Sequence, residues 1–195
     1  MELSREIDVL VKDIWEKQMK EDYDKCVFWE ESVLKSAFYH HLRQGIRDKA
    51  LKDDLVLYPE MRVISKGKPL RIDLAVVEIP ECGIRTSRQC ETKWKKDGSC
   101  ITKLIAVFEF KHWEQKYPKP LHTALRKFTK SLQDQQVYYC YDKSRRPLTA
   151  DLLYFCIILD KWPTREQIIE KPISSTNLRI LIGGSFREKI EFKYL

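Results

Sequence analysis

The chain has 195 residues, of which 43% are hydrophobic and 33% charged, which is the balance of a globular domain that buries a full core. Six glycines and eight prolines exclude a long flexible linker or a low-complexity tail. The net charge of +7 favours a polyanionic partner, because Lys and Arg release counterions from phosphates. The longest apolar run, residues 152–159, falls short of the roughly 20 residues that span a bilayer.

The N-terminal residues and the cysteines both predict a cytoplasmic protein. Charges in residues 1–6 stand where a signal peptide has its apolar core. The six cysteines lie at irregular spacings, which predicts reduced thiols. Cys82, Cys90 and Cys100 cluster without forming a C-x-x-C pair, which argues against a structural zinc site.

Two amphipathic helices are predicted first, over residues 3–20 and 28–50, because apolar residues recur there at helical spacing. An extended segment (55–63) and a turn (65–69) lead into a strand that carries Asp73. The expected buried residues of the two helices are Leu3, Ile7, Leu10, Val11, Ile14 and Trp15, then Val33, Leu34, Ala37, Phe38, Leu42 and Ile46.

The second half of the chain alternates further strands and helices. Residues 80–103 are rich in Cys, Lys, Arg and Thr and are expected to form a hairpin or loop insertion before a strand that ends at Lys111. A helix over 121–139 precedes a continuously apolar strand, 152–159, of the kind covered on both faces. The remaining expected elements are a short helix over 164–170 and strands over 178–182 and 189–194.

This order of elements predicts an α/β fold with a mixed central sheet flanked by helices. We expect one domain over residues 1–195. Its parts are a helical extension (1–27), a core (28–160) that contains the insertion, and C-terminal strands (161–195).

Acidic residues stand in two strongly β-prone runs where Val or Ile would be usual. Asp73 lies in one run, and Glu109, Phe110 and Lys111 end the other. Burying an unpaired carboxylate costs several kcal/mol, and hard oxygen ligands suit Mg²⁺ as the compensating partner. Because side chains alternate along a strand, Glu109 and Lys111 share a face. The pattern therefore predicts a metal site formed by Asp73, Glu109 and the Phe110 carbonyl, with a strand-end Glu–Lys pair as the alternative.

With these residues the chain resembles the PD-(D/E)xK, or restriction-endonuclease-like, superfamily over about residues 28–159. Asp73 fits the first acid, and Glu109-Phe110-Lys111 fits E-x-K, while Ile72 replaces the proline. The resemblance implies an αβββαβ core. The motif acids lie 36 positions apart, so residues 80–103 would be an insertion between the two motif strands.

The resemblance also implies a function, that of a Mg²⁺- or Mn²⁺-dependent endonuclease. Such a hydrolase cleaves phosphodiester bonds by means of a metal-activated water, and most of the superfamily acts on DNA. Lys111 would lie beside the attacking water. A chain of this size is expected to dimerise if it makes double-strand cuts, and no membrane partner is expected.

Further acids are candidates on the same grounds. The superfamily often adds an acid from its first core helix, and Glu30 and Glu31 are the candidates; the alternative is that both only favour the helix dipole. Glu60, on the preceding strand, is either a supporting carboxylate or a solvent-facing residue.

Basic and polar residues elsewhere are weaker candidates for nucleic-acid contact. Lys130 and Gln133 follow the motif on a helix and are possible supporting residues. In the insertion, Lys93, Trp94, Lys95 and Lys96 combine clustered charge with an aromatic residue, as nucleic-acid contacts often do. Arg126 and Lys127 lie on the helix after the motif. For both groups the alternative is an ordinary solvated surface.

Two other functions remain open. One is a non-catalytic nucleic-acid-binding or protein-interaction module on the same fold, against which the intact acid–acid–lysine set argues. The other is a basic accessory protein whose resemblance is accidental. Metal-dependent cleavage separates all three.

Overall fold

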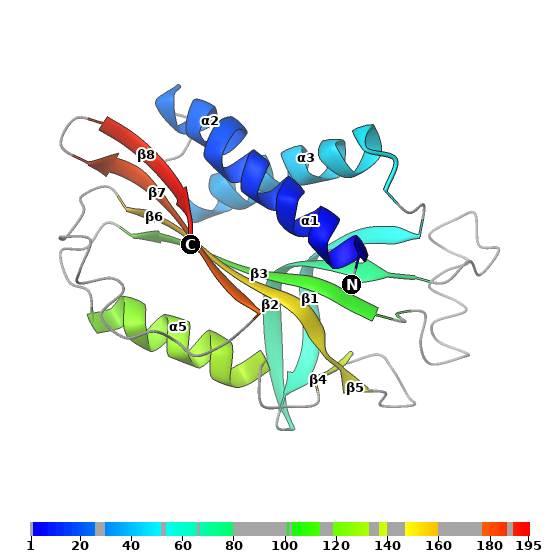
Figure 1. Ribbon diagram of the computed structural model, residues 1–195. Coiled ribbons are helices and arrows are strands. Elements are labelled where there is room, and N and C mark those ends of the chain that lie inside the picture. The colour runs from blue at the N-terminus through cyan, green and yellow to red at the C-terminus, as the bar shows by residue number, and fades with distance from the viewer. Residues whose placement is uncertain are drawn as a thin grey trace.

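A computed structural model describes residues 2–25, 30–51, 54–65, 67–79, 101, 103–113, 119–132, 137–139, 147–159, 177–186 and 189–195. In these residues an eight-stranded mixed sheet runs in the order β5-β4-β1-β2-β3-β6-β7-β8. Helices cover both of its faces (Figure 1). Apart from two short strands between α5 and β6, namely β4 (Val137–Tyr139) and β5 (Pro147–Leu148), the elements from α3 to β6 follow the expected αβββαβ order, so the predicted fold class is confirmed.

The centre of the sheet is built from three long antiparallel strands. β1 (Leu55–Ser65) and β2 (Lys68–Glu78) form a hairpin. Its turn contains Gly67 at φ 71°, a left-handed conformation that glycine adopts without steric cost. β3 (Lys103–Trp113) pairs with β2. The two strands that carry the predicted motif acids are therefore neighbours.

The remaining strands extend the sheet in both directions. β6 (Ala150–Leu159) runs parallel to β3, and β7 (Leu178–Phe186) runs parallel to β6. β8 (Lys189–Tyr194) closes that edge antiparallel to β7. β5 (Pro147–Leu148) forms the opposite edge next to β4.

One predicted helix is too long. α5 spans Lys119–Leu132, and Val137–Tyr139 forms β4 instead of continuing it. These three residues are β-prone and pair with Val63–Ser65 of β1, so sheet pairing decides their conformation. The predicted helix over 164–170 and almost all of the 80–103 insertion lie outside the described residues.

The N-terminal helix is longer than predicted and has three parts. α1 (Glu2–Asp13) continues through a π-helical segment (Ile14–Met19) into α2 (Lys20–Asp24). These parts and α3 (Glu31–Asp48) cover one face of the sheet, while α5 covers the other (Figure 1). None of the described helices combines the length and apolarity needed to cross a membrane.

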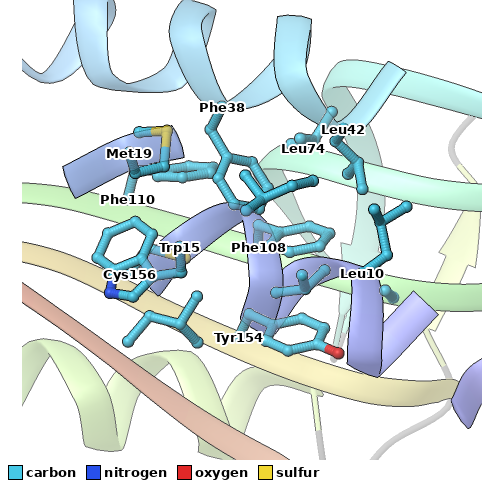
Figure 2. Close-up of a cluster of buried hydrophobic side chains, with 14 of the residues drawn as sticks. Leu10, Trp15, Met19, Phe38, Leu42, Leu74, Phe108, Phe110, Tyr154 and Cys156 are labelled. Atoms are coloured by element: carbon cyan, nitrogen blue, oxygen red, sulfur yellow. The ribbon is translucent and has the colours of Figure 1, made fainter. Parts of the chain in front are cut away.

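Aromatic side chains join α3 to the sheet. Phe38 packs with ring centroids 5.1 Å from Phe108 and 5.2 Å from Phe110, and Phe108 stacks on Tyr154 at 4.6 Å (Figure 2). This packing holds α3 against β3. The predicted apolar residues that are fully or almost fully buried are Ile7, Leu10, Val11, Ile14, Trp15, Leu34, Phe38 and Leu42.

Candidate active site

The register of β2 and β3 brings the two motif acids together. The ladder reaches Leu74 opposite Phe108, so the next residues on the two strands are Asp73 and Glu109. They are 36 positions apart in the sequence. The expected pairing of the two motif strands is therefore present.

Asp73 is almost fully buried, with 8% of its surface exposed. The Phe110 backbone N–H donates a 2.9 Å hydrogen bond to its Oδ2. Lys35 Nζ donates a 2.7 Å hydrogen bond to its Oδ1. Both oxygens are thus bonded, which offsets the cost of burying the carboxylate.

Lys111 connects the motif strand to α3. Its Nζ lies 3.0 Å from Glu109 Oε1 and donates a 2.8 Å hydrogen bond to the Phe110 carbonyl. The same nitrogen lies 3.7 Å from Glu31 Oε2. The ammonium is therefore held close to the two oxygen donors that the sequence assigns to a metal.

The two acids at the start of α3 occupy different positions. Glu31 begins the helix and places its carboxylate 3.1 Å from Lys35 Nζ as well as near Lys111. Glu30 is the exposed N-cap residue, and its Oε2 accepts a hydrogen bond from Ser32 Oγ at 3.2 Å. Glu31 therefore contacts the lysines of the cluster, whereas Glu30 bonds with Ser32 at the start of the helix.

Glu60 lies in β1 opposite Asp73 and has an unusual backbone. The neighbouring β1–β2 pairs set it at that position, and its φ is 54°. A left-handed conformation at a non-glycine residue costs on the order of 1 kcal/mol or more and tends to occur at functional sites. Its carboxylate lies 2.7 Å from Arg71 Nε and 3.7 Å from Lys35 Nζ.

Lys35 is a site residue that sequence reasoning missed. Its side chain is 21% exposed, and its nitrogen contacts Asp73, Glu31 and Glu60. Burial alone would lower the pKa of Lys35, but its bonds to Asp73 and Glu31 outweigh burial and raise it, so the side chain stays charged. Its position four residues after Glu31 was the available signal, because i,i+4 residues are neighbours on a helix.

The carboxylates repel one another. Burial and the nearby charge of Asp73 raise the pKa of Glu109, and Lys111 offsets only part of that effect. Within the described residues, no three His, Cys, Asp or Glu side chains are arranged to hold a metal ion. The ammonium groups of Lys35 and Lys111 lie against these oxygens instead.

The donor set nevertheless fits a divalent metal. Asp73, Glu109 and the Phe110 carbonyl offer hard oxygen ligands, which Mg²⁺ prefers. A divalent cation would also relieve the repulsion that raises the pKa of Glu109.

An open pocket of about 650 Å³ adjoins this cluster. Hydroxyl-bearing residues of α3 (Ser32, Ser36 and Tyr39) line one side of it. Glu60 and Asp73 line the other. The pocket therefore borders both Asp73 and the Lys35 side chain that is bonded to it.

The other predicted site residues lie elsewhere. Arg126, Lys127 and Lys130 are exposed on α5, which covers the face of the sheet opposite α3 (Figure 1). The structure does not bring them to the pocket beside Asp73. The remaining candidates lie outside the described part of the chain: Gln133, Lys93, Trp94, Lys95 and Lys96.

No protein-family model matches the chain, and no curated protein sequence does either. Two solved structures are similar at 14% sequence identity. NucC of E. coli MS115-1 in its cAAA-bound form has a TM-score of 0.44, over 98% of this chain and 83% of that chain. NucC of P. aeruginosa ATCC27853, also cAAA-bound, has a TM-score of 0.43, over 98% of this chain and 82% of that chain. At this similarity the function has to be argued from the site.

Proposed function

We propose that the chain is a divalent-metal-dependent nuclease that hydrolyses phosphodiester bonds, with DNA as its substrate. The observation that carries the proposal is the convergence of Asp73, Glu109 and Lys111 at adjoining positions of β2 and β3. Glu31 joins them from α3. The net charge of +7 supports a polyanionic substrate.

The proposal gives each of these residues a role, which its contacts support. Asp73, Glu109 and the Phe110 carbonyl supply the oxygen ligands, with Glu31 in the outer shell. A bound Mg²⁺ or Mn²⁺ supplies positive charge for the scissile phosphate and lowers the pKa of a water ligand. Lys111 is held by Glu109 and the Phe110 carbonyl, and it presents its ammonium to charge that develops on the phosphate.

The choice of DNA rests on the resemblance to the PD-(D/E)xK superfamily. One site of this kind cuts one strand, so we propose that double-strand cleavage uses two copies of the chain.

One observation favours the alternative of a non-catalytic module on the same fold. Lys35 already neutralises Asp73 at 2.7 Å, so the buried acid is satisfied without a metal. The two functions differ in one measurable respect, because only the nuclease cleaves nucleic acid in a manner that depends on both metal and Asp73.

The test is a cleavage assay with purified protein. Plasmid, linear duplex DNA, single-stranded DNA and RNA are each incubated with Mg²⁺, Mn²⁺ or EDTA. Asp73→Asn is compared with the wild type and reveals any contaminating nuclease, which would not depend on Asp73. Glu6→Gln, at an exposed position of α1, controls for the effect of a substitution as such.

We expect DNA cleavage that EDTA and Asp73→Asn abolish and Glu6→Gln retains. Absence of metal-dependent cleavage of every substrate, or equal cleavage by Asp73→Asn, contradicts the proposal and favours the non-catalytic module. Cleavage of RNA alone contradicts the choice of DNA.

A further inference from the structure

Three carboxylates from three elements converge on one ammonium group. Lys35 Nζ lies 2.7 Å from Asp73 Oδ1 of β2 and 3.1 Å from Glu31 Oε1 of α3. It lies 3.7 Å from Glu60 Oε1 of β1. These are oxygens of the kind that bind a divalent cation.

This arrangement differs from the other lysine pairs on the helices of the N-terminal layer. In the described part of the chain, Lys17 forms an ion pair with Asp13 and Lys25 with Glu21, four residues away in each case, and both lysine side chains are more than 60% exposed. Lys35 is 21% exposed and reaches across to two strands. Its position therefore depends on contacts between α3, β1 and β2.

The charge balance gives Lys35 a specific effect. The cluster holds four carboxylates, those of Glu31, Glu60, Asp73 and Glu109. Among the residues that the structure describes, three cationic groups contact them, those of Lys35, Lys111 and Arg71. Without the charge of Lys35, two carboxylates have no cationic counterpart, which matches the charge of one divalent cation.

We infer that Lys35 is an internal counter-ion that competes with a divalent cation for the Asp73 carboxylate, so that metal binding requires the ammonium to move away. The inference rests on the proposed function, since it concerns the same carboxylates. An ammonium at 2.7 Å from Asp73 Oδ1 occupies part of the space around that oxygen, and a divalent cation bound there would be repelled by it.

The Lys35 side chain can move into the adjoining pocket. Its flexible four-carbon stem can turn toward that pocket, which Lys35 itself lines. There the ammonium remains within reach of a phosphate group. Lys35 is thus a positioning residue that keeps the site charge-balanced while no metal is bound and lowers its affinity for metal.

The test measures Mn²⁺ binding by isothermal titration calorimetry without nucleic acid. Lys35→Met removes the charge and keeps the stem, whereas Lys35→Arg keeps the charge. We expect Lys35→Met to bind Mn²⁺ about tenfold more tightly than the wild type, or more, because a repelling unit charge is gone. Lys35→Arg should stay close to the wild type.

Two additional measurements locate the effect. Adding Asp73→Asn to Lys35→Met should abolish the gain in affinity, which assigns the gain to this site. The Mn²⁺-dependent rise in Tm should be larger for Lys35→Met than for the wild type, because tighter binding to the folded state stabilises it more. If Lys35→Met does not fold by circular dichroism, Lys35→Gln takes its place.

The outcomes separate this inference from the proposed function. Equal or weaker Mn²⁺ binding by Lys35→Met overturns the inference, whereas DNA cleavage by the wild type still supports the nuclease. Tighter binding without any cleavage supports the inference and contradicts the nuclease. Absence of both binding and cleavage overturns both.

Discussion

Two polar clusters centred on a carboxylate are set against the same sheet, and they are built in opposite ways. In the first, which we call the Asp8 cluster, Tyr154 donates a 2.6 Å hydrogen bond to Asp8 Oδ1, and Tyr194 donates to the same oxygen. Arg179 Nε lies 3.6 Å from Oδ2. One carboxylate therefore has two hydroxyl donors and one cation, and it joins α1 to β6, β7 and β8.

The second cluster, around Asp73, has four carboxylates and only three cationic groups in contact with them among the described residues, so negative charge is in excess. Burial and the nearby charge of Asp73 raise the pKa of Glu109, and Glu60 holds a left-handed backbone conformation. In the Asp8 cluster, burial and the bonds to Asp8 raise the pKa of Tyr154 and Tyr194, so both hydroxyls remain donors. We therefore expect the Asp8 cluster to stabilise the fold, whereas the like charges held together around Asp73 should cost stability, as the proposed metal site would require.

The largest expected effect tests whether the Asp73 cluster, unlike the Asp8 cluster, is needed for DNA cleavage. Lys111→Met should lower the rate of DNA cleavage by about 10²–10³-fold, the usual cost of removing one preorganised charge donor, while the free energy of unfolding changes little. Initial cleavage rates and urea denaturation check both parts. Lys17→Met, at an exposed pair on the N-terminal helix, is the matched control. Cleavage activity within a few-fold of the wild type would show that Lys111 does not take part in catalysis.

The next effect tests whether the Asp8 cluster, unlike the Asp73 cluster, stabilises the fold. Asp8→Ala should lower the free energy of unfolding by about 2–4 kcal/mol, because the hydroxyls of buried Tyr154 and half-buried Tyr194 lose their shared acceptor and Arg179 loses its contact with Asp8. Cleavage activity should be unchanged at a temperature where the variant is folded. The control is Asp13→Ala, which breaks only an exposed pair with Lys17. Equal stability of the two variants would show that the Asp8 cluster does not stabilise the fold.

A smaller effect tests the strain beside Asp73. Glu60→Asn should raise the free energy of unfolding relative to Glu60→Gln by up to about 1 kcal/mol, because Asn tolerates a left-handed backbone better. Both changes remove the same carboxylate, so their difference isolates the backbone. Urea denaturation measures it, and identical stabilities would argue against strain at this residue.

The smallest effect is a pH dependence at Glu109. Its folded-state pKa is raised above 4.5, so the folded state holds the proton longer than the unfolded state as pH rises. Wild-type stability should therefore fall, relative to Glu109→Gln, as pH rises from about 4.5 through the raised value. Urea denaturation at several pH values should show the variant more stable at neutral pH and similar near pH 4. A difference independent of pH would contradict the repulsion.

Local patterns in the sequence predicted most of the described elements. The apolar spacing of Phe38 and Leu42 predicted a buried helix face, the β-prone runs predicted the strands of Asp73 and Glu109, and a continuous apolar run predicted the strand of Phe155. Val137–Tyr139 was wrongly predicted as helical, because its conformation depends on a partner strand far away in the sequence.

The sequence by itself determined which residues form helices and strands and which short motif carries charge, because these properties depend on near neighbours along the chain. Only the tertiary structure decided that Leu74 pairs with Phe108, that Glu31 rather than Glu30 reaches Lys111, and that Lys35 contacts Asp73. The physical reason is that strand register and helix docking are fixed by packing between residues distant in sequence, such as Phe38 against Phe108.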